Sequence, residues 1–185
     1  MRILTLLLCL LIPIAIAQDA QTLEVRARYA ECNMLEKRSN VYEFQRVLLG
    51  NDLGPWQRAD PKAVDVYSAM KVHASKSQIR SVYLEESSAS GDWSSTTSYC
   101  FRANGTLAFQ FRKYRTFSTD APHAVEVQTR SYFAASGKRF KLLETILDVV
   151  TNKAVKASYM PMPETTFPTS SGVVKEIGSG LLPLK

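Results

Sequence analysis

The sequence predicts an α+β domain in which one N-terminal helix packs on an antiparallel β-meander of about five to seven strands. Three observations lead to this fold class. An early segment carries apolar residues at helical spacing, several later segments alternate apolar and polar residues, and the connections between those segments are short. Short connections favour antiparallel neighbours, because parallel strands need long crossovers.

The predicted helix covers Leu23–Arg38. Val25, Tyr29 and Cys32 recur every three or four residues, so they form an apolar stripe along one side of the helix. Such a stripe needs a partner surface. A sheet face that the helix can cover is the simplest partner in this chain.

The predicted strands follow the helix, separated by turns such as the one at residues 50–55. The first two segments are also compatible with a short helix, and the later ones have the composition or alternation of half-buried strands. The strand candidates are Val41–Leu49, Ala63–Met70, Ile79–Leu84, Thr96–Ala103, Thr106–Phe117, Ala124–Phe133, Phe140–Val150 and Ala154–Met160.

Asn104-Gly105 is the strongest hairpin pattern in the chain. A two-residue loop places Cys100 on the same sheet face as Leu107, Phe109 and Phe111. A three-residue loop places Cys100 on the opposite face, because one residue of register shift exchanges the two faces. The sequence leaves both registers open.

Residues 1–17 resemble an export signal, with Arg2, a short apolar run and a small-x-small cleavage site at Ala15-Ile16-Ala17. We therefore expect a periplasmic or secreted protein with no transmembrane segment in the mature chain. Residues 18–160 are predicted as a single domain. Residues 161–185 are predicted as an extended or mobile tail, because Pro and Gly recur in them.

Removal of the predicted signal leaves two cysteines, Cys32 and Cys100, since Cys9 lies within the signal. In an oxidising compartment the simplest expectation is one disulfide between them. The mature chain keeps 22 Lys and Arg against 17 Asp and Glu, a net charge of +5. This mild excess would help attract an anionic partner, although solubility alone also explains it, and nucleic acid is not expected outside the cytosol.

Three short motifs also stand in a suggestive order: Tyr29-Ala30-Glu31-Cys32-Asn33, then Tyr99-Cys100-Phe101 with Gly105, Leu107 and Phe109 after it, then Arg130-Ser131-Tyr132-Phe133 with Gly137-Lys138. Over about residues 22–150 the chain resembles a loosely defined group of small exported bacterial β-meander proteins. It departs from that pattern at Cys32, where an apolar residue is expected. The resemblance implies the fold and a bacterial periplasm, and it implies no activity.

The sequence nominates no catalytic, metal or cofactor site. His73 and His123 lack zinc-ligand spacing, and the chain holds no Gly-x-Ser-x-Gly or Ser-x-x-Lys motif. Glu85 and Glu86 are adjacent, so on a strand they point to opposite faces and cannot form an acid–base pair by themselves.

The candidate binding residues are the most basic stretch, Arg112, Lys113, Tyr114 and Arg115, together with Trp93. The basic stretch suggests an anion-docking surface with Tyr114 as its anchor, although strand charge also protects sheet edges. Trp93 would either line a ligand cleft or pack over the end of the sheet. We expect a non-catalytic binding domain whose partner is an envelope protein, a lipid or an anionic glycan. The alternatives are a small envelope hydrolase with a site assembled from loops, and an inhibitor that inserts the loop Ser87–Ser95 into an enzyme.

Overall fold

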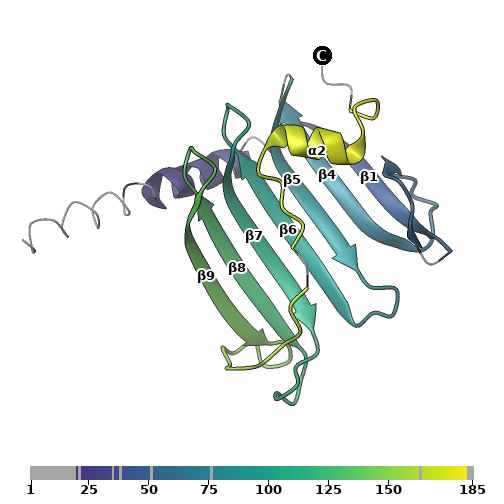
Figure 1. The fold of residues 1–185 in the computed structure, drawn as a ribbon, viewed down its shortest axis with the longest axis vertical. Helices are drawn as coiled ribbons and strands as arrows, with labels where there is room; N and C mark the ends of the chain where they lie inside the picture. Colours follow the sequence, from purple (N-terminus) through teal and green to yellow (C-terminus); the bar gives the residue numbers. More distant parts are fainter. Residues whose placement is uncertain are drawn as a thin grey trace, which may run out of the picture.

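The computed structural model describes residues 20, 22–34, 36–37, 39–50, 52–75, 77–162 and 164–182, so the predicted signal lies outside the described residues. They form one nine-stranded antiparallel sheet in the order β2-β1-β4-β5-β6-β7-β8-β9, with β3 also paired to β1 (Figure 1). The strands are β1 (Asn40–Leu49), β2 (Asp52–Leu53), β3 (Gln57–Arg58), β4 (Val66–Ser75), β5 (Gln78–Ser87), β6 (Trp93–Phe101), β7 (Leu107–Thr116), β8 (Val125–Phe133) and β9 (Arg139–Asp148).

The predicted meander is confirmed, because each strand from β4 to β9 pairs with the next one along the chain. The sheet has more strands than expected, since β2 and β3 each contribute two residues beside β1. The first two strand candidates, which were also compatible with helix, form β1 and β4. Within the described residues two helices accompany nine strands, so this part of the protein is mostly β.

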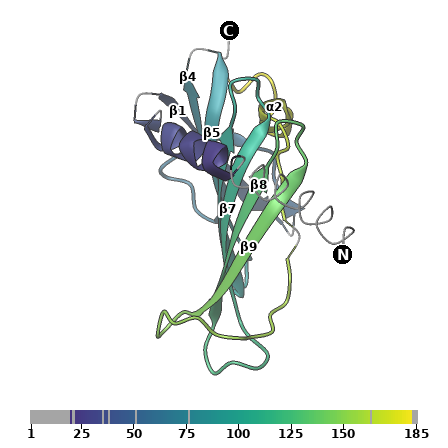
Figure 2. The ribbon, with the colours of Figure 1, turned by 90° about the vertical axis from the view of Figure 1, so that its left-hand side faces the viewer.

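Alternating side chains give the sheet two apolar faces, and each face has its own cover. We call them the helix face, covered by the N-terminal helix at residues 22–34, and the tail face, covered by residues 151–162 and 164–182. Figure 2 shows the N-terminal helix and α2 (Ser170–Ile177) on opposite sides of the sheet. The larger core lies on the tail face and includes Phe44, Met70, Leu84, Tyr99 and Val173.

The N-terminal helix is held on its face by packing and by a disulfide. Val25, Cys32, Cys100, Phe109 and Tyr132 form the core beneath it. The predicted disulfide between Cys32 and Cys100 is confirmed, with their Cα atoms 6.1 Å apart. Its cysteines are only 4% and 2% exposed. The helix therefore covers the face that holds Cys100.

The predicted extended tail contains a helix that the sequence argument missed. Thr169 caps α2 by accepting a hydrogen bond from the amide of Gly172, and Gly178 ends the helix with φ +100°. Val173 and Ile177, four residues apart, are both buried. Two buried residues one turn apart, with a cap at each end, are thus enough for a short helix that docks on the tail face.

The rest of the tail runs extended across the same face (Figure 1). The hydroxyl of Tyr99 donates to the carbonyl of Thr165, and that of Tyr114 donates to Met160 at 3.1 Å. The segment Ala154–Met160, predicted as a strand, forms only isolated bridges to the sheet. Side-chain hydroxyls, rather than a β-ladder, satisfy part of its backbone.

The hairpin register combines both alternatives that the sequence left open. Arg102 and Thr106 flank a three-residue loop in which Gly105 has φ +82°. A bulge then shifts the register, so that Phe101 pairs with Leu107 but Cys100 pairs with Phe109. Leu107 consequently joins the core of the tail face, whereas Cys100 lies beside Phe109 on the helix face.

Candidate functional site

Strand alternation divides the predicted binding residues between the two faces. In the ladder between β6 and β7, Arg112 pairs with Thr97 and Tyr114 pairs with Ser95, on the tail face. Lys113 and Arg115 point the other way, to the helix face. The four residues of the basic stretch therefore lie on opposite faces of one sheet, two on each face.

The tail-face residues are engaged inside the protein. Tyr114 is 3% exposed and binds the tail through its hydroxyl, while Trp93 packs against its ring with centroids 6.3 Å apart. Arg112 lies over the same ring at 5.0 Å and donates to the Ser95 hydroxyl at 3.1 Å. Arg112 and Tyr114 border a cavity of about 170 Å³ that Tyr159 also lines. These three residues therefore have a structural role. Tyr114 binds the tail, and Trp93 and Arg112 pack against the Tyr114 ring.

On the helix face, the part that the N-terminal helix leaves open is strongly basic. Lys113, Arg115, Arg130 and Lys141 lie there, on the adjacent strands β7, β8 and β9. Lys113 and Arg115 are exposed, and the other two are half-buried. We call this surface the cationic face, and define it by Tyr83, Ser94, Thr96, Phe111, Lys113, Arg115, Glu126, Gln128, Arg130 and Lys141.

Glu126 is the acid among these four cations, and it is already paired; the exposed Glu85 is a second acid on this side of the sheet, opposite Thr96. Its carboxylate accepts from Arg115 Nε and from Gln128 Nε2, each at 2.7 Å. Burial by itself would raise the pKa of Glu126, but the hydrogen bonds from Gln128 and Arg115 outweigh it and lower the pKa. Glu126 therefore orients its neighbours as a fixed anion, and Lys113, Arg130 and Lys141 remain in excess.

Aromatic rings beneath these cations hold them near the surface. Arg130 lies 4.8 Å and Lys113 5.8 Å from the ring centroid of Phe111, and Lys141 lies 5.8 Å from that of Tyr132. The cationic groups thus lie over aromatic rings on the exposed side of the sheet.

Two cavities along β5 and β6 continue this surface toward the helix. One of about 240 Å³ is bordered by Lys113, Arg115 and the hydroxyl residues of β6. The other, of about 230 Å³, lies beside the disulfide, and Tyr83 belongs to both. Burial and the neighbouring Glu85 raise the pKa of Tyr83, which keeps its hydroxyl protonated as a donor.

The cavity beside the disulfide, which we call the helix pocket, contains a serine next to a carboxylate. The Ser81 hydroxyl donates to Glu36 Oε1 at 2.9 Å, and His73 pairs with Ser81 across the sheet. His73 Nδ1 is buried without a hydrogen-bond partner among the described residues. Lys71 also lines the helix pocket.

The predicted inhibitor loop is shorter and more compact than expected. β5 continues to Ser87 and β6 begins at Trp93, so only residues 88–92 form the connection. Within it the Ser90 hydroxyl donates to Asp92 and also lies 3.3 Å from the Ser88 hydroxyl. Insertion of this loop into an enzyme stays a prediction.

Arg130 belongs to the cationic face, but it lies outside the basic stretch from Arg112 to Arg115 that the sequence indicated. Its pattern was present in the sequence, because Glu126, Gln128 and Arg130 alternate along one side of the strand. The sequence could not predict that Phe111 pairs with Arg130, and this pairing brings Arg130 beside Lys113.

In the described part of the chain, no helix has the length and apolar character needed to cross a bilayer. Comparison with protein-family models, with curated proteins and with solved structures finds no match for this chain.

Proposed function

We propose that this protein is a non-catalytic binding domain, working outside the cytosol, whose cationic face holds an acidic polysaccharide. The observation that carries the proposal is the placement of Lys113, Arg115, Arg130 and Lys141 on one uncovered surface, where Glu126 is already paired with Arg115 and the exposed Glu85 lies two strands from Lys113. The disulfide supports an oxidising compartment.

The spacing of the cations suits an extended, repeating anion. Neighbouring strands lie about 4.8 Å apart, and alternate residues along a strand are about 7 Å apart. Lys113 and Arg115 are alternate residues of β7, and Arg130 lies on the next strand. A chain of sugars with regularly placed carboxylates or sulfates meets such a grid along its length. The hydroxyls of Ser94 and Thr96 offer further hydrogen bonds to the sugar.

Charge reversal on the cationic face is expected to weaken this binding. In calorimetric titrations with alginate and heparin as probes, Lys113→Glu with Arg130→Glu should raise the dissociation constant by about tenfold or more. Binding by the unchanged protein should also weaken as salt is added, because exposed charges are screened.

The matched control carries Lys153→Glu and Lys156→Glu, which changes net charge equally at two exposed positions after β9. It should bind both probes as the unchanged protein does, and neutral dextran should bind to none of them. Equal loss in both double variants would mean that net charge alone matters. If the unchanged protein bound neither alginate nor heparin, the proposal would be wrong.

A second candidate function, hydrolysis in the helix pocket, is favoured by the contact between Ser81 and Glu36. A carboxylate that accepts the serine proton is the arrangement that activates a nucleophile, and His73 and Lys71 lie in the same cavity. Ser81 is 3% exposed, which leaves little room for a substrate carbonyl.

We expect a fluorophosphonate probe to leave Ser81 unlabelled, because the hydroxyl is buried. The measurement is mass spectrometry of the treated protein, with Ser81→Ala as the control for labelling elsewhere. Adduct formation on Ser81, with ester hydrolysis that disappears in Ser81→Ala, would establish the hydrolase instead.

A further inference from the structure

Four exposed apolar side chains gather at one end of the sheet, in the loops that follow β7 and β9. Phe117 is 65% exposed, Val149 40%, Val150 70% and Met160 72%. We call these four residues the apolar tip. The loops that carry them protrude beyond the strands at the lower end of the molecule (Figures 1 and 2).

The strand register places Phe117, Val149 and Met160 near one another, and Val150 follows Val149 in the same turn. Thr116, Val125 and Asp148 form the last paired row of β7, β8 and β9. Phe117 and Val149 are the next residues outward, so they stand two strands, or about 10 Å, apart. Ser118 bridges to Tyr159 in antiparallel fashion, which sets Phe117 opposite Met160.

Hydrogen bonds hold these loops in place. The backbone of Ser158 accepts from the Thr119 amide at 3.3 Å and donates to Asp120 Oδ1 at 2.7 Å. The carbonyl of Met160 is bound by Tyr114, although its side chain faces solvent. The apolar side chains are therefore displayed on a fixed scaffold.

The turn that carries Val149 and Val150 is held by Asp148. Its Oδ1 accepts from the amides of Val150 and Thr151 at 3.0 and 2.7 Å, and His123 Nδ1 lies 2.8 Å from its Oδ2. The amide of Thr151 and the His123 ring lower the pKa of Asp148 to about 2. Its charge is satisfied within the turn.

The unpaired charge around the apolar tip is positive. Lys153 and Lys156 are exposed in the loop after β9. The carboxylates of the two loops, Asp120 and Asp148, are both occupied by hydrogen bonds from the loops themselves. Apolar side chains flanked by lysines are the combination by which peripheral proteins enter the head-group region of anionic bilayers.

We propose that the apolar tip inserts into the surface of an anionic lipid bilayer and so attaches this protein to a membrane. The four side chains line none of the three cavities described above, and they project from separate loops. A protruding apolar point suits a fluid interface, which closes around it, better than a partner of fixed shape. This attachment is independent of the polysaccharide site, which lies on the helix face.

Vesicle flotation tests the proposal with the purified protein. We expect flotation with vesicles of phosphatidylcholine mixed with phosphatidylglycerol, and much less with phosphatidylcholine alone. Phe117→Ser with Val150→Ser should lower the partition coefficient by about tenfold or more, since two apolar contacts with the lipid are lost. Lys153→Glu with Lys156→Glu should lower flotation with the mixed vesicles and weaken its dependence on salt.

Two controls separate this proposal from the polysaccharide site. Met34→Ser with Val64→Ser changes residues of similar exposure, 63% and 77%, away from the tip and should leave flotation unchanged. Lys113→Glu with Arg130→Glu should also float as before. Failure of the unchanged protein to float, full flotation of the Phe117 and Val150 variant, or loss confined to the Lys113 and Arg130 variant would each overturn the proposal.

Discussion

Replacing Cys32 and Cys100 together by alanine is expected to lower the free energy of unfolding by about 4 kcal/mol. The disulfide joins residues 68 apart in sequence, so it removes many conformations from the unfolded chain. It also fixes the N-terminal helix to the sheet, where the core beneath the helix is the smaller of the two. Urea unfolding followed by circular dichroism measures the effect.

Reduction provides the control for this expectation. A thiol reductant should shift the unfolding midpoint of the unchanged protein toward that of the double alanine variant, and should not shift the variant further. Amides of residues 22–34 should exchange with deuterium faster once the bond is gone, because the helix loses its anchor. An unchanged midpoint in the variant would show that helix packing alone is sufficient.

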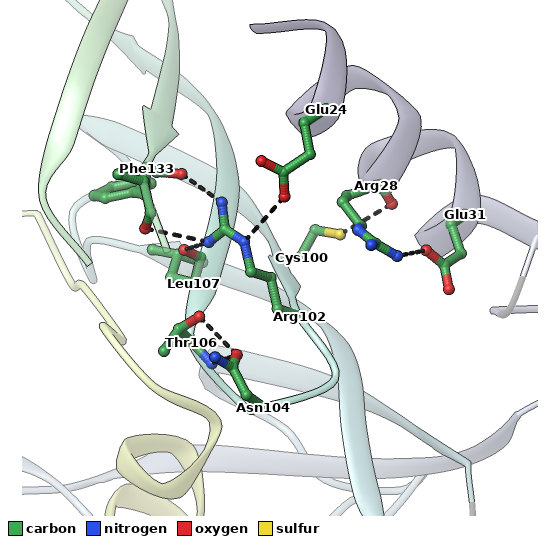
Figure 3. A network of polar contacts seen from close by, with 10 residues as sticks. Glu24, Arg28, Glu31, Cys100, Arg102, Asn104, Thr106, Leu107 and Phe133 are labelled. Carbon is green, nitrogen blue, oxygen red and sulfur yellow. Dashed lines mark hydrogen bonds and ion pairs between the residues drawn. The ribbon is translucent and has the colours of Figure 1, made fainter. Parts of the chain in front are cut away.

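Replacing Arg102 by methionine is expected to cost about 3 kcal/mol, because a buried cation there binds several backbone carbonyls. Arg102 is 8% exposed, and its Nη atoms donate to Leu107 at 2.8 Å, to Phe133 at 2.6 Å and to Ala134 at 3.3 Å (Figure 3). These carbonyls belong to the first residue of β7, the last residue of β8 and the residue that follows β8. Methionine fills similar space but donates no hydrogen bond to them.

The ion pair of Arg102 with the N-terminal helix should matter much less. Glu24 Oε1 lies 3.6 Å from Arg102 Nε, and the Glu24 side chain is 48% exposed (Figure 3). Glu24→Gln should therefore lower stability by less than about 1 kcal/mol. The measurement is the same urea titration for both variants. Similar losses for the two would contradict the view that Arg102 acts mainly through the carbonyls.

Much of the fold could be predicted because its local patterns agree with its packing. The apolar stripe with Val25 and Cys32 predicts the N-terminal helix, and the alternation in β7 and β8 predicts half-buried strands. Two cysteines in a chain that resembles an exported protein predict the disulfide. In each case the decisive information lies within a few neighbouring residues.

The remainder depended on partners distant in sequence. α2 is short and follows Pro168, so its stability comes from docking Val173 and Ile177 on the sheet rather than from helix propensity. The bulge beside Cys100 changes the face on which the residues around it lie, and no residue of the turn indicates that the bulge is there. Arg102 lies next to a hairpin loop, where a charged residue usually indicates exposure.

The candidate site shows the same limit. Four consecutive residues, Arg112 to Arg115, were predicted as one surface, but a strand turns alternate side chains to opposite faces. Pairing with β8 instead brings Arg130 beside Lys113. Alternation was available from the sequence, whereas strand register across the connection at residues 117–124 was not.

Lysine footprinting in the presence of alginate tests the central claim most directly. The purified protein is acetylated with and without the polymer, and the modification of each lysine is measured by mass spectrometry. Lys113 and Lys141 should be protected, while Lys153 and Lys156 should react as they do in the free protein. Protection at Lys153 and Lys156 with none at Lys113 and Lys141 would contradict a polysaccharide site on the cationic face.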